Sequence, residues 1–281
     1  MAKLIEGKIV AKKILENLSD EILFLEKKPC LAVIIAGDDA ASKIYVNSKK
    51  KKAEELGIKS VVIELPQNCT QQEILEKIYT LNNDDSVNGI LVQLPLPPQI
   101  NAKEVVEKIH PLKDVDGLHP YNLGQIAAGN KPHAYPCTPK GIIRLLEYYD
   151  ISIAGKHAVI IGRSNLVGRP LSLMLLNENA TVTVCHSKTK NLSQITQQAD
   201  ILVSAAGQRG LVKADMVKDG AVVIDVGINR QEDGKLCGDV DFWGAEPRAS
   251  YITPVPGGVG PMTICSLMQN TFDLYKIQNK I

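Results

Sequence analysis

Tyr45 and Lys49 are the first side chains along this sequence that could carry out chemistry together, because they stand four residues apart. On a helix this spacing puts a phenol ring and an amine on the same face. Lys49 begins a run of four lysines, and at about 100° per residue the last of them, Lys52, returns to within about 20° of Tyr45. Helical periodicity therefore leaves Lys49 and Lys52 both open as the reactive lysine.

Gln93 and Asp116 are the next candidates. Gln93 lies near the end of the apolar strand expected at 89–94, and ligands of open parallel sheets bind beyond the carboxyl ends of the strands. Asp114 and Asp116 precede Gly117, where they could bind a ligand or simply form a turn. These residues lie where expected strands end, so a site is predicted there.

A second group of candidates lies in a glycine-edged turn that joins an apolar strand to a helix. The turn begins with Gly162-Arg163-Ser164 and reaches Gly168. Such a turn directs free backbone N–H groups and a helix dipole at a phosphate. Its glycines do not follow the G-x-G-x-x-G pattern of dinucleotide-binding turns, so an ordinary strand–helix turn is the alternative.

The end of the next strand indicates which cofactor this turn would hold. An Asp or Glu usually stands about 20 residues after the glycines and binds a free ribose 2′-hydroxyl, but this sequence has Cys185-His186-Ser187-Lys188 there. Arg163 and Ser187 could instead hold a 2′-phosphate through charge-assisted hydrogen bonds. The sequence therefore predicts NADP rather than NAD. Lys188 is more simply explained as a solvated side chain.

Residues 254–263 include six glycines and prolines between a strand-like segment and a helix-like tail. Proline fixes the backbone φ angle, and glycine lets the main chain approach a ligand closely. The segment predicts a rigid wall with few side chains, and a plain connecting loop is the alternative.

Apolar runs that alternate with amphipathic stretches predict the elements that position these residues. A covering helix is expected first, and the βαβαβ order that follows is typical of a parallel sheet. In the first half the helix is expected at 7–25 and the alternating strands and helices at 31–35, 40–56, 60–65, 70–81 and 89–94. In the second half strands are expected at 157–161, 181–184, 201–204 and 221–226, and a terminal helix at 262–281.

This order predicts an α/β fold with two domains. A stretch rich in Pro and Gly after Lys113 interrupts the alternation, so the first domain is placed at residues 1–140. Residues 141–261 are expected to form a second, Rossmann-like domain with a doubly wound parallel sheet. The helix at 262–281 is expected to pack back on the first domain. The length of 281 residues also exceeds the ~100–200 residues typical of one domain.

Composition narrows the classes of function. The sequence has 32 Lys and Arg against 31 Asp and Glu, a formal net charge of +1, so neither nucleic acid nor a membrane is an expected partner. No apolar run reaches the ~18 residues of a membrane span, and the first six residues lack a signal-peptide core, so a cytoplasmic location is expected. The six cysteines form no C-x-x-C pair, and no metal site is predicted.

Taken together, these motifs resemble the bifunctional methylenetetrahydrofolate dehydrogenase/methenyltetrahydrofolate cyclohydrolase family over nearly the whole chain. The resemblance implies two α/β domains around a cleft, a homodimer, NADP as cofactor and tetrahydrofolate derivatives as substrates. It also implies oxidation of 5,10-methylene-tetrahydrofolate to the 5,10-methenyl cation, and hydrolysis of that cation to 10-formyl-tetrahydrofolate. The matching segments are residues 42–49, 89–97, 113–117, 162–170 and 254–263.

The resemblance further implies a role for each candidate residue. Lys49 would act in hydrolysis by moving a proton or polarising the intermediate, and Gln93 would orient it. Tyr45 would stack on the pterin-derived ring, and Asp116 would accept paired N–H bonds from the 2-amino-4-oxo edge of that ring. The implied contacts to NADP are Gly162, Arg163, Ser164, Ser187 and Ile228, and the implied backbone contacts to the folate are Pro256, Gly257 and Gly258.

Three other interpretations share some of these features. Short-chain dehydrogenases also have a Tyr-x-x-x-Lys pair, but their nucleotide-binding turn precedes the pair, whereas here it follows. A shikimate-type dehydrogenase also has a substrate domain before its nucleotide domain. Its substrate has no pterin ring, so it does not explain residues 113–117 as a segment that binds the edge of such a ring. A nucleotide-responsive regulator without chemistry is disfavoured by the near-neutral charge.

Overall fold

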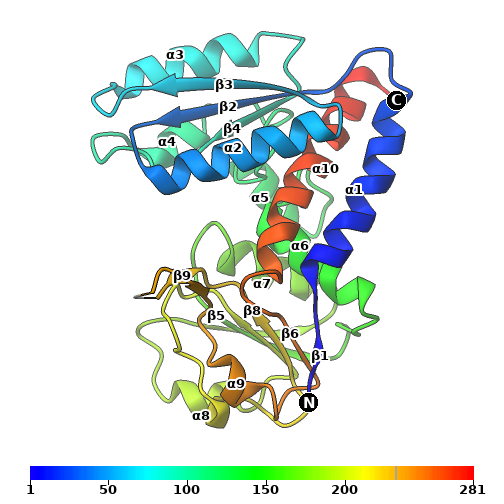
Figure 1. The fold of residues 1–281 in the computed structure, drawn as a ribbon, viewed down its shortest axis with the longest axis vertical. Coiled ribbons are helices and arrows are strands. Elements are labelled where there is room, and N and C mark those ends of the chain that lie inside the picture. The colour runs from blue at the N-terminus through cyan, green and yellow to red at the C-terminus, as the bar shows by residue number, and fades with distance from the viewer. Residues whose placement is uncertain (232) are drawn as a thin grey trace. The chain divides into compact units, whose positions relative to one another are not determined.

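The computed structural model describes residues 1–231 and 233–281, including all of their side chains except that of residue 41 (Figure 1). These residues divide into two compact units. The six-stranded unit consists of Met1–Lys12 and Thr138–Thr263, and the three-stranded unit consists of Lys13–Cys137 and Ile264–Ile281. Each unit has a parallel sheet and helices, so the predicted α/β class is confirmed.

The three-stranded unit is built on a parallel sheet of strand order β3-β2-β4. Every residue of the central strand is buried, as expected for a parallel strand covered on both faces. Alternate residues of this strand enter opposite cores, Val33 on the side of α2 and Ile34 on the side of α3 (Figure 1). The elements are β2 (Cys30–Ala36), α2 (Ala40–Glu55), β3 (Lys59–Leu65), α3 (Gln71–Asn82) and β4 (Gly89–Val92).

Side-chain caps fix where the two longer helices of this sheet begin. At the start of α3, Thr70 Oγ1 accepts from the Glu73 N–H at 3.2 Å, and the Glu73 carboxylate accepts from the Thr70 N–H at 2.6 Å, which is a capping box. At the start of α2, the Asp39 carboxylate accepts from the Ser42 N–H at 2.7 Å. Each cap satisfies a backbone N–H of the first turn that has no partner within its helix.

The helices α1 (Gly7–Leu23) and α10 (Val259–Asn279) contribute residues to both units. In the three-stranded unit, Ile22 and Met268 enter the core on the α2 side of the sheet, and Tyr275 Oη donates to Lys27 O at 2.7 Å. Within the described residues no helix has both the length and the apolarity needed to cross a membrane. The remaining helices of this unit are α4 (Ala102–Val106) and α5 (Pro120–Ala127).

The described residues of the six-stranded unit form a parallel sheet of order β1-β11-β8-β7-β5-β6. The chain runs from β5 outward to β6 and then returns to β7 and β8 on the other side of β5, which is the doubly wound order predicted from the sequence. The strands are β1 (Lys3–Leu4), β5 (His157–Ile161), β6 (Thr181–Cys185), β7 (Ile201–Ser204), β8 (Val222–Asp225) and β11 (Tyr251–Ile252). The other elements are α6 (Cys137–Tyr148), α7 (Gly168–Asn177), α8 (Leu192–Thr196), the 3-10 helix η1 (Ala214–Met216), the β9 (Asn229–Arg230) and β10 (Leu236–Cys237) hairpin, and α9 (Phe242–Ala245).

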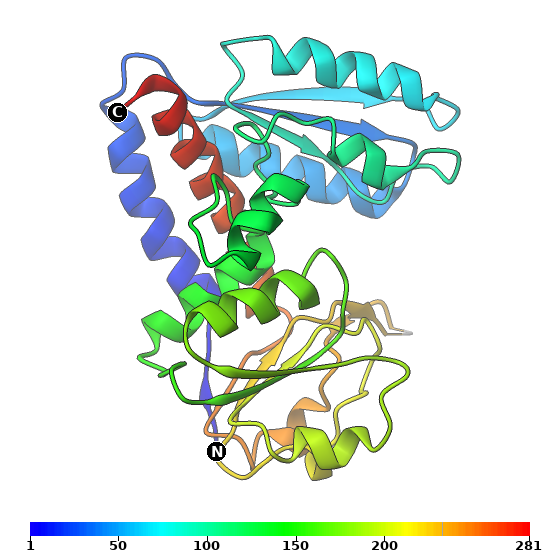
Figure 2. The same ribbon diagram turned by 180° about the vertical axis from the view of Figure 1, so that it is seen from behind.

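Two features of this unit differ from the sequence-based expectation. No strand is predicted before residue 7, yet β1 pairs with β11 along the edge of the sheet (Figure 2); two residues are too few for a periodic pattern. The terminal helix is predicted from residue 262, but α10 begins at Val259. Pro261 fits in the first turn of a helix, where a missing N–H costs no hydrogen bond.

Candidate active site

A hydrogen bond joins Lys49 and Gln93, which are 44 residues apart in the sequence. Lys49 Nζ donates to Gln93 Oε1 at 2.9 Å. The Gln93 backbone N–H donates to Ile34 O at 2.8 Å, next to the end of β4, and its Nε2 donates to Leu94 O at 2.6 Å. The glutamine is therefore held at its backbone and at its amide nitrogen, with the oxygen directed at the lysine.

The two lysines that periodicity left open have different surroundings. Lys52 forms an ion pair with Glu55, on the same helix. Among the described contacts, Lys49 and not Lys52 reaches Gln93. Tyr45 lies one helical turn before Lys49 and is 42% exposed, so part of its ring is open to a planar ligand.

Lys113, in the motif that contains Asp116, is buried and serves as an anchor. Its Nζ donates to Leu81 O at 2.9 Å and to Asp84 O at 2.8 Å, at the end of α3. Burial lowers the pKa of Lys113. Its carbonyl accepts from the Ile90 N–H at 2.7 Å, at the start of β4. The lysine thus attaches the Asp116 loop to the sheet. This is a structural role that the sequence does not indicate.

Asp114 is the carboxylate that forms the turn in this loop. It is buried, and its Oδ2 accepts from the His119 N–H at 2.8 Å and from Asn122 Nδ2 at 2.9 Å. Burial raises the pKa of Asp114 against the effect of these bonds. Gly117 has φ +68°, and a Cβ there would lie 2.4 Å from the backbone carbonyl carbon of Tyr135. Asp116 stands between these two fixed residues and is only half-buried, so the turn presents it to solvent and ligands.

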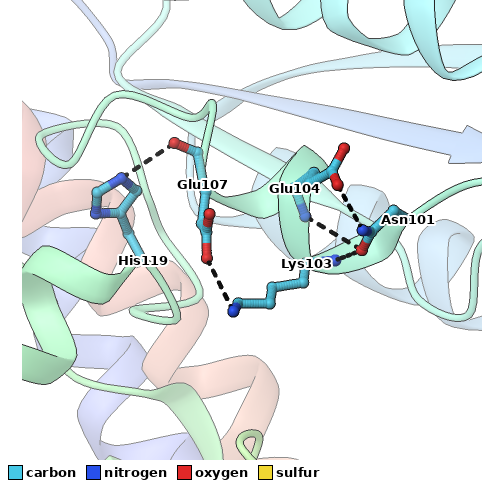
Figure 3. A network of polar contacts seen from close by, with 5 residues as sticks. All are labelled: Asn101, Lys103, Glu104, Glu107 and His119. Atoms are coloured by element: carbon cyan, nitrogen blue, oxygen red, sulfur yellow. Dashed lines mark hydrogen bonds and ion pairs between the residues drawn. The ribbon is translucent and has the colours of Figure 1, made fainter.

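A polar network holds the far side of the same loop to α4 (Figure 3). His119 Nδ1 accepts from the Tyr121 N–H at 3.0 Å, so its Nε2 carries the proton and donates to Glu107 O at 3.2 Å. The Glu107 carboxylate pairs with Lys103 at 3.8 Å, and Asn101 caps α4 by accepting from the Lys103 N–H at 3.2 Å. The loop that carries Asp116 is therefore tied to α3, β4 and α4.

The glycine-edged turn lies between β5 and α7 and is tightly packed. At Gly162 φ is +127°, and an added Cβ would lie 2.3 Å from Ala205 O. At Gly168 an added Cβ would lie 2.1 Å from Gly162 O. Ser164 Oγ accepts from the Val167 N–H at 3.2 Å, which holds the turn in shape. Side chains are excluded at both glycines, so the backbone at the start of α7 can approach a phosphate closely, as a dinucleotide requires.

The loop after β6 lies beside this turn, because β5 and β6 pair up to their last residues, Ile161 and Cys185. The Gly162 N–H donates to Cys185 O at 2.8 Å and joins the two strand ends. Arg163 and Ser187 each lie within two residues of these ends, and both are exposed. The two residues predicted to bind a 2′-phosphate therefore follow adjacent strands and remain accessible.

Ile228 follows β8 at the same carboxyl edge of the sheet, and its side chain is 50% exposed. An apolar side chain that is open to solvent at this edge suits contact with a flat ring. Among the described residues no three His, Cys, Asp or Glu side chains are grouped so that they could hold a metal ion.

The segment that contains Pro256, Gly257 and Gly258 is packed against the start of α1 within the six-stranded unit. Gly257 has φ +112°, and its carbonyl accepts from the Lys8 N–H at 3.1 Å. A Cβ on Gly7 would lie 1.8 Å from Gly258 O. This close packing explains the glycines structurally. Pro256 is exposed, and contact of the segment with the folate remains a prediction.

Two buried carboxylates near the nucleotide turn were not found by sequence reasoning. Asp225 ends β8, and Asp239 follows the β10 strand; they are 3% and 0% exposed. The Asp225 carboxylate accepts backbone N–H groups of Gly227, Asp239 and Val240 at 3.0, 2.9 and 2.9 Å. Burial raises the pKa of Asp225 from 3.8 to about 6, and the Asp239 charge adds to this effect. For Asp225, a carboxylate at the end of an otherwise apolar strand was the available signal.

The raised pKa of Asp225 predicts a pH-dependent contribution to stability. The folded state holds this proton more tightly than the unfolded chain, so the contribution is full below pH 3.8 and is lost as the pH rises through about 6. The stability advantage of the wild type over Asp225→Asn should therefore grow by about 1 kcal/mol between pH 7 and pH 5. Urea unfolding of both proteins at the two pH values measures this, and an advantage that is independent of pH would contradict the assignment.

Comparison with known families gives two matches that together span most of the chain. Residues 5–116 match the catalytic domain of tetrahydrofolate dehydrogenase/cyclohydrolase, and residues 136–279 match the NAD(P)-binding domain of the same enzymes. The chain belongs to the tetrahydrofolate dehydrogenase/cyclohydrolase family. This confirms the resemblance found in the sequence motifs.

Individual members of the family are similar to this chain along its whole length. The bifunctional protein FolD of Campylobacter jejuni strain RM1221 is 56% identical over 271 residues, which cover 95% of this chain and 96% of that protein. A crystal structure of the bifunctional dehydrogenase/cyclohydrolase from Campylobacter jejuni has a TM-score of 0.97 at 53% identity, with full coverage of both chains. The Trypanosoma brucei enzyme, solved with NADP and an inhibitor, has a TM-score of 0.95 at 41% identity and covers 100% of this chain and 99% of its own.

Shikimate dehydrogenase, the enzyme alternative from the sequence, is a much more distant structural neighbour. The protein from Thermus thermophilus has a TM-score of 0.54 at 13% identity. This likeness concerns the fold alone.

Proposed function

We propose that this protein is a bifunctional enzyme of one-carbon metabolism. It oxidises 5,10-methylene-tetrahydrofolate to the 5,10-methenyl cation with NADP, and it hydrolyses the cation to 10-formyl-tetrahydrofolate. The observation that carries the proposal is the 2.9 Å hydrogen bond from Lys49 Nζ to Gln93 Oε1, because a positioned amine serves the hydrolytic step and is not needed for hydride transfer. Relatives up to 56% identical are named as bifunctional proteins.

The oxidation step requires little chemistry from side chains. Hydride leaves a carbon that is flanked by two nitrogens, and their lone pairs stabilise the cation that develops. The protein therefore has to hold the reacting carbon close to the hydride acceptor and exclude other orientations. When bound, NADP supplies the acceptor through its nicotinamide ring.

Hydrolysis requires proton transfer, because water loses a proton as it attacks the cation and a ring nitrogen later gains one. In our proposal Lys49 is the group that moves this proton or polarises the intermediate. A lysine ammonium has three donors, and Gln93 accepts from one of them. The others are free to point toward water and the substrate, so Gln93 acts by fixing the direction of the lysine.

The folate ring is proposed to bind between Tyr45 and Asp116. The partly open ring of Tyr45 supplies a stacking surface for the pterin-derived ring. Asp116, held by the anchored turn, can accept two N–H bonds from the 2-amino-4-oxo edge. Stacking fixes the plane of the substrate, and the carboxylate fixes its rotation within that plane.

NADP is the proposed cofactor because of the side chains after β5 and β6. Arg163 and Ser187 follow adjacent strand ends, and the four residues from Cys185 include no carboxylate that would select a free 2′-hydroxyl. The Trypanosoma brucei relative was solved with NADP, which agrees with this choice. Gly162 and Ser164 would hold the pyrophosphate at the start of α7, and Ile228 would contact the nicotinamide.

A homodimer in the cytoplasm is the proposed assembly and location. The strand β3 lies at the edge of its sheet and has an exposed Val61, and an edge strand has backbone groups that a second copy can pair. The six cysteines, all among the described residues, are thiols rather than disulfides, as in proteins of reducing compartments. Sedimentation should give twice the chain mass of 30.6 kDa, and a monomer mass would contradict the dimer.

Two separate assays of purified protein test the proposed function. Addition of 5,10-methylene-tetrahydrofolate and NADP should produce NADPH, and 5,10-methenyl-tetrahydrofolate supplied without cofactor should lose its ultraviolet absorbance faster than in buffer. Absence of both activities would overturn the proposal. Tight NADP binding without either turnover would favour the nucleotide-responsive regulator.

A further inference from the structure

The buried carboxylate of Asp239 connects the loops that follow two adjacent strands. Its Oδ2 accepts from the Ala206 N–H at 2.8 Å, from the Gly207 N–H at 3.1 Å and from Ser204 Oγ at 3.2 Å, all in or after β7. Its Oδ1 accepts from Asn229 Nδ2 at 3.0 Å, in the segment after β8. One side chain thus fixes residues 205–207 relative to residues 226–229.

Asp225 holds Asp239 in place. Its Oδ1 accepts from the Asp239 N–H and its Oδ2 from the Val240 N–H, both at 2.9 Å. The backbone around the pair leaves room for the carboxylates only because glycines stand there. A Cβ on Gly227 would lie 2.2 Å from Asp239 Oδ1, and a Cβ on Gly238 would lie 1.8 Å from Asp225 Oδ2.

Two buried carboxylates are an expensive way to stabilise a fold. Removing a carboxylate from water costs free energy that only well-placed hydrogen bonds offset, and burial raises the pKa of Asp225. Such a pair is better explained by the specific loop conformation that it imposes than by stability alone.

The strand order locates the loops that this pair controls. The nucleotide turn follows β5, the predicted 2′-phosphate ligands follow β5 and β6, and the order of the sheet is β8-β7-β5-β6. A dinucleotide crosses the carboxyl edge of such a sheet at the switch point of the strand order. The adenosine end of the cofactor is predicted to lie at β6. Its nicotinamide end would then lie over the loops after β7 and β8.

We propose that Asp239, held by Asp225, is a positioning residue for the nicotinamide half of the cofactor. The proposal rests on the proposed function, because it assumes that NADP binds at this edge. Asp239 acts through the loops at residues 205–207 and 226–229, and the latter loop includes the exposed Ile228. Its carboxylate sets where these loops place the nicotinamide ring at the carboxyl edge of the sheet.

The substitution Asp239→Asn tests this role. It keeps the size of the side chain but replaces one acceptor oxygen with an NH₂ donor. In either orientation of the amide, this donor faces other donors, either the N–H groups of residues 206 and 207 or the side-chain amide of Asn229. Loss of hydrogen bonds to a charged group predicts a decrease in kcat/KM for NADP-dependent oxidation of about tenfold or more. The affinity for 2′,5′-ADP, which has the adenosine end and no nicotinamide, should stay within about twofold of the wild type. Hydrolysis of 5,10-methenyl-tetrahydrofolate without cofactor should be unchanged.

Two further variants make the test decisive. Asp241→Asn removes the same charge two residues along the chain and should leave all three measurements unchanged. Asn229→Ala removes only the link from Asp239 to the loop after β8 and should lower NADP-dependent oxidation about threefold or more, in the range of one hydrogen bond, with 2′,5′-ADP affinity retained. This milder variant keeps the test valid if Asp239→Asn fails to fold.

Three results would overturn the inference. Oxidation by both variants at the wild-type rate would show that the loops need no such restraint. A loss of 2′,5′-ADP affinity as large as the loss of NADP-dependent oxidation, in both variants, would show that Asp239 only supports the fold of its unit. A wild-type protein that hydrolyses the methenyl compound but does not reduce NADP would overturn the proposed dehydrogenase function, and the inference with it.

Discussion

Replacement of Lys49 by methionine should lower the rate of 5,10-methenyl-tetrahydrofolate hydrolysis by about 10²–10⁴-fold, the usual contribution of a positioned proton-transfer group. Methionine has a similar length and flexibility but no N–H donor. The variant therefore loses the bond to Gln93 and the group that would contact the attacking water. Folate binding should change little, because Tyr45 and Asp116 remain in place.

Lys52→Met is the matched control for this prediction. It removes the same charge from the same helix, but Lys52 pairs with Glu55 at the surface, and exposed ion pairs contribute ~0–1 kcal/mol to stability. Its hydrolysis rate should remain close to that of the wild type. Loss of hydrolysis in Lys52→Met with retention in Lys49→Met would show that the reactive lysine had been assigned wrongly.

Replacement of Arg163 by glutamate should weaken NADP binding by about 10–100-fold and NAD binding much less. A hydrogen bond between charged groups is worth about 1.5–3 kcal/mol, and the new carboxylate would also repel the 2′-phosphate. NAD has a neutral hydroxyl in place of the 2′-phosphate, so its affinity should fall only by the weaker effect of the altered surface charge. Titration of each variant with both cofactors measures the two losses.

Arg169→Glu is a suitable control for the change in charge. Arg169 is exposed near the start of α7, close to the same turn, and the substitution changes the net charge equally. We expect it to affect NADP and NAD to a similar and small extent. Equal losses of NADP and NAD affinity in Arg163→Glu would remove the 2′-phosphate argument.

The regular elements that position the site could be predicted because each has a periodic apolar pattern. The strands β5, β6, β7 and β8 lie within one residue of their expected bounds, and the buried β2 was equally clear. The two-residue strand β1 was missed because its pairing with β11 is made by residues 248 positions away in the sequence, Lys3 with Tyr251. Local pattern has no information about such a partner.

Residue types and their spacing predicted which side chains could form the candidate site, but not which of them contact one another. Periodicity alone could not distinguish Lys49 from Lys52, and the bond to Gln93 distinguishes them through a contact between a helix and a strand end. Asp225 and Asp239 were missed for a related reason. In the sequence Asp225 lies inside the expected strand 221–226, and Asp239 directly follows a glycine. Their importance depends on N–H groups from three separate loops.

Bifunctional catalysis is tested most directly by one progress curve. Wild-type protein is mixed with 5,10-methylene-tetrahydrofolate and NADP, and NADPH and the methenyl compound are followed together by absorbance. We predict that NADPH rises while the methenyl compound stays at a low steady level and 10-formyl-tetrahydrofolate accumulates. Methenyl compound that accumulates mole for mole with NADPH, or a complete absence of NADPH, would contradict the assignment of both activities to this chain.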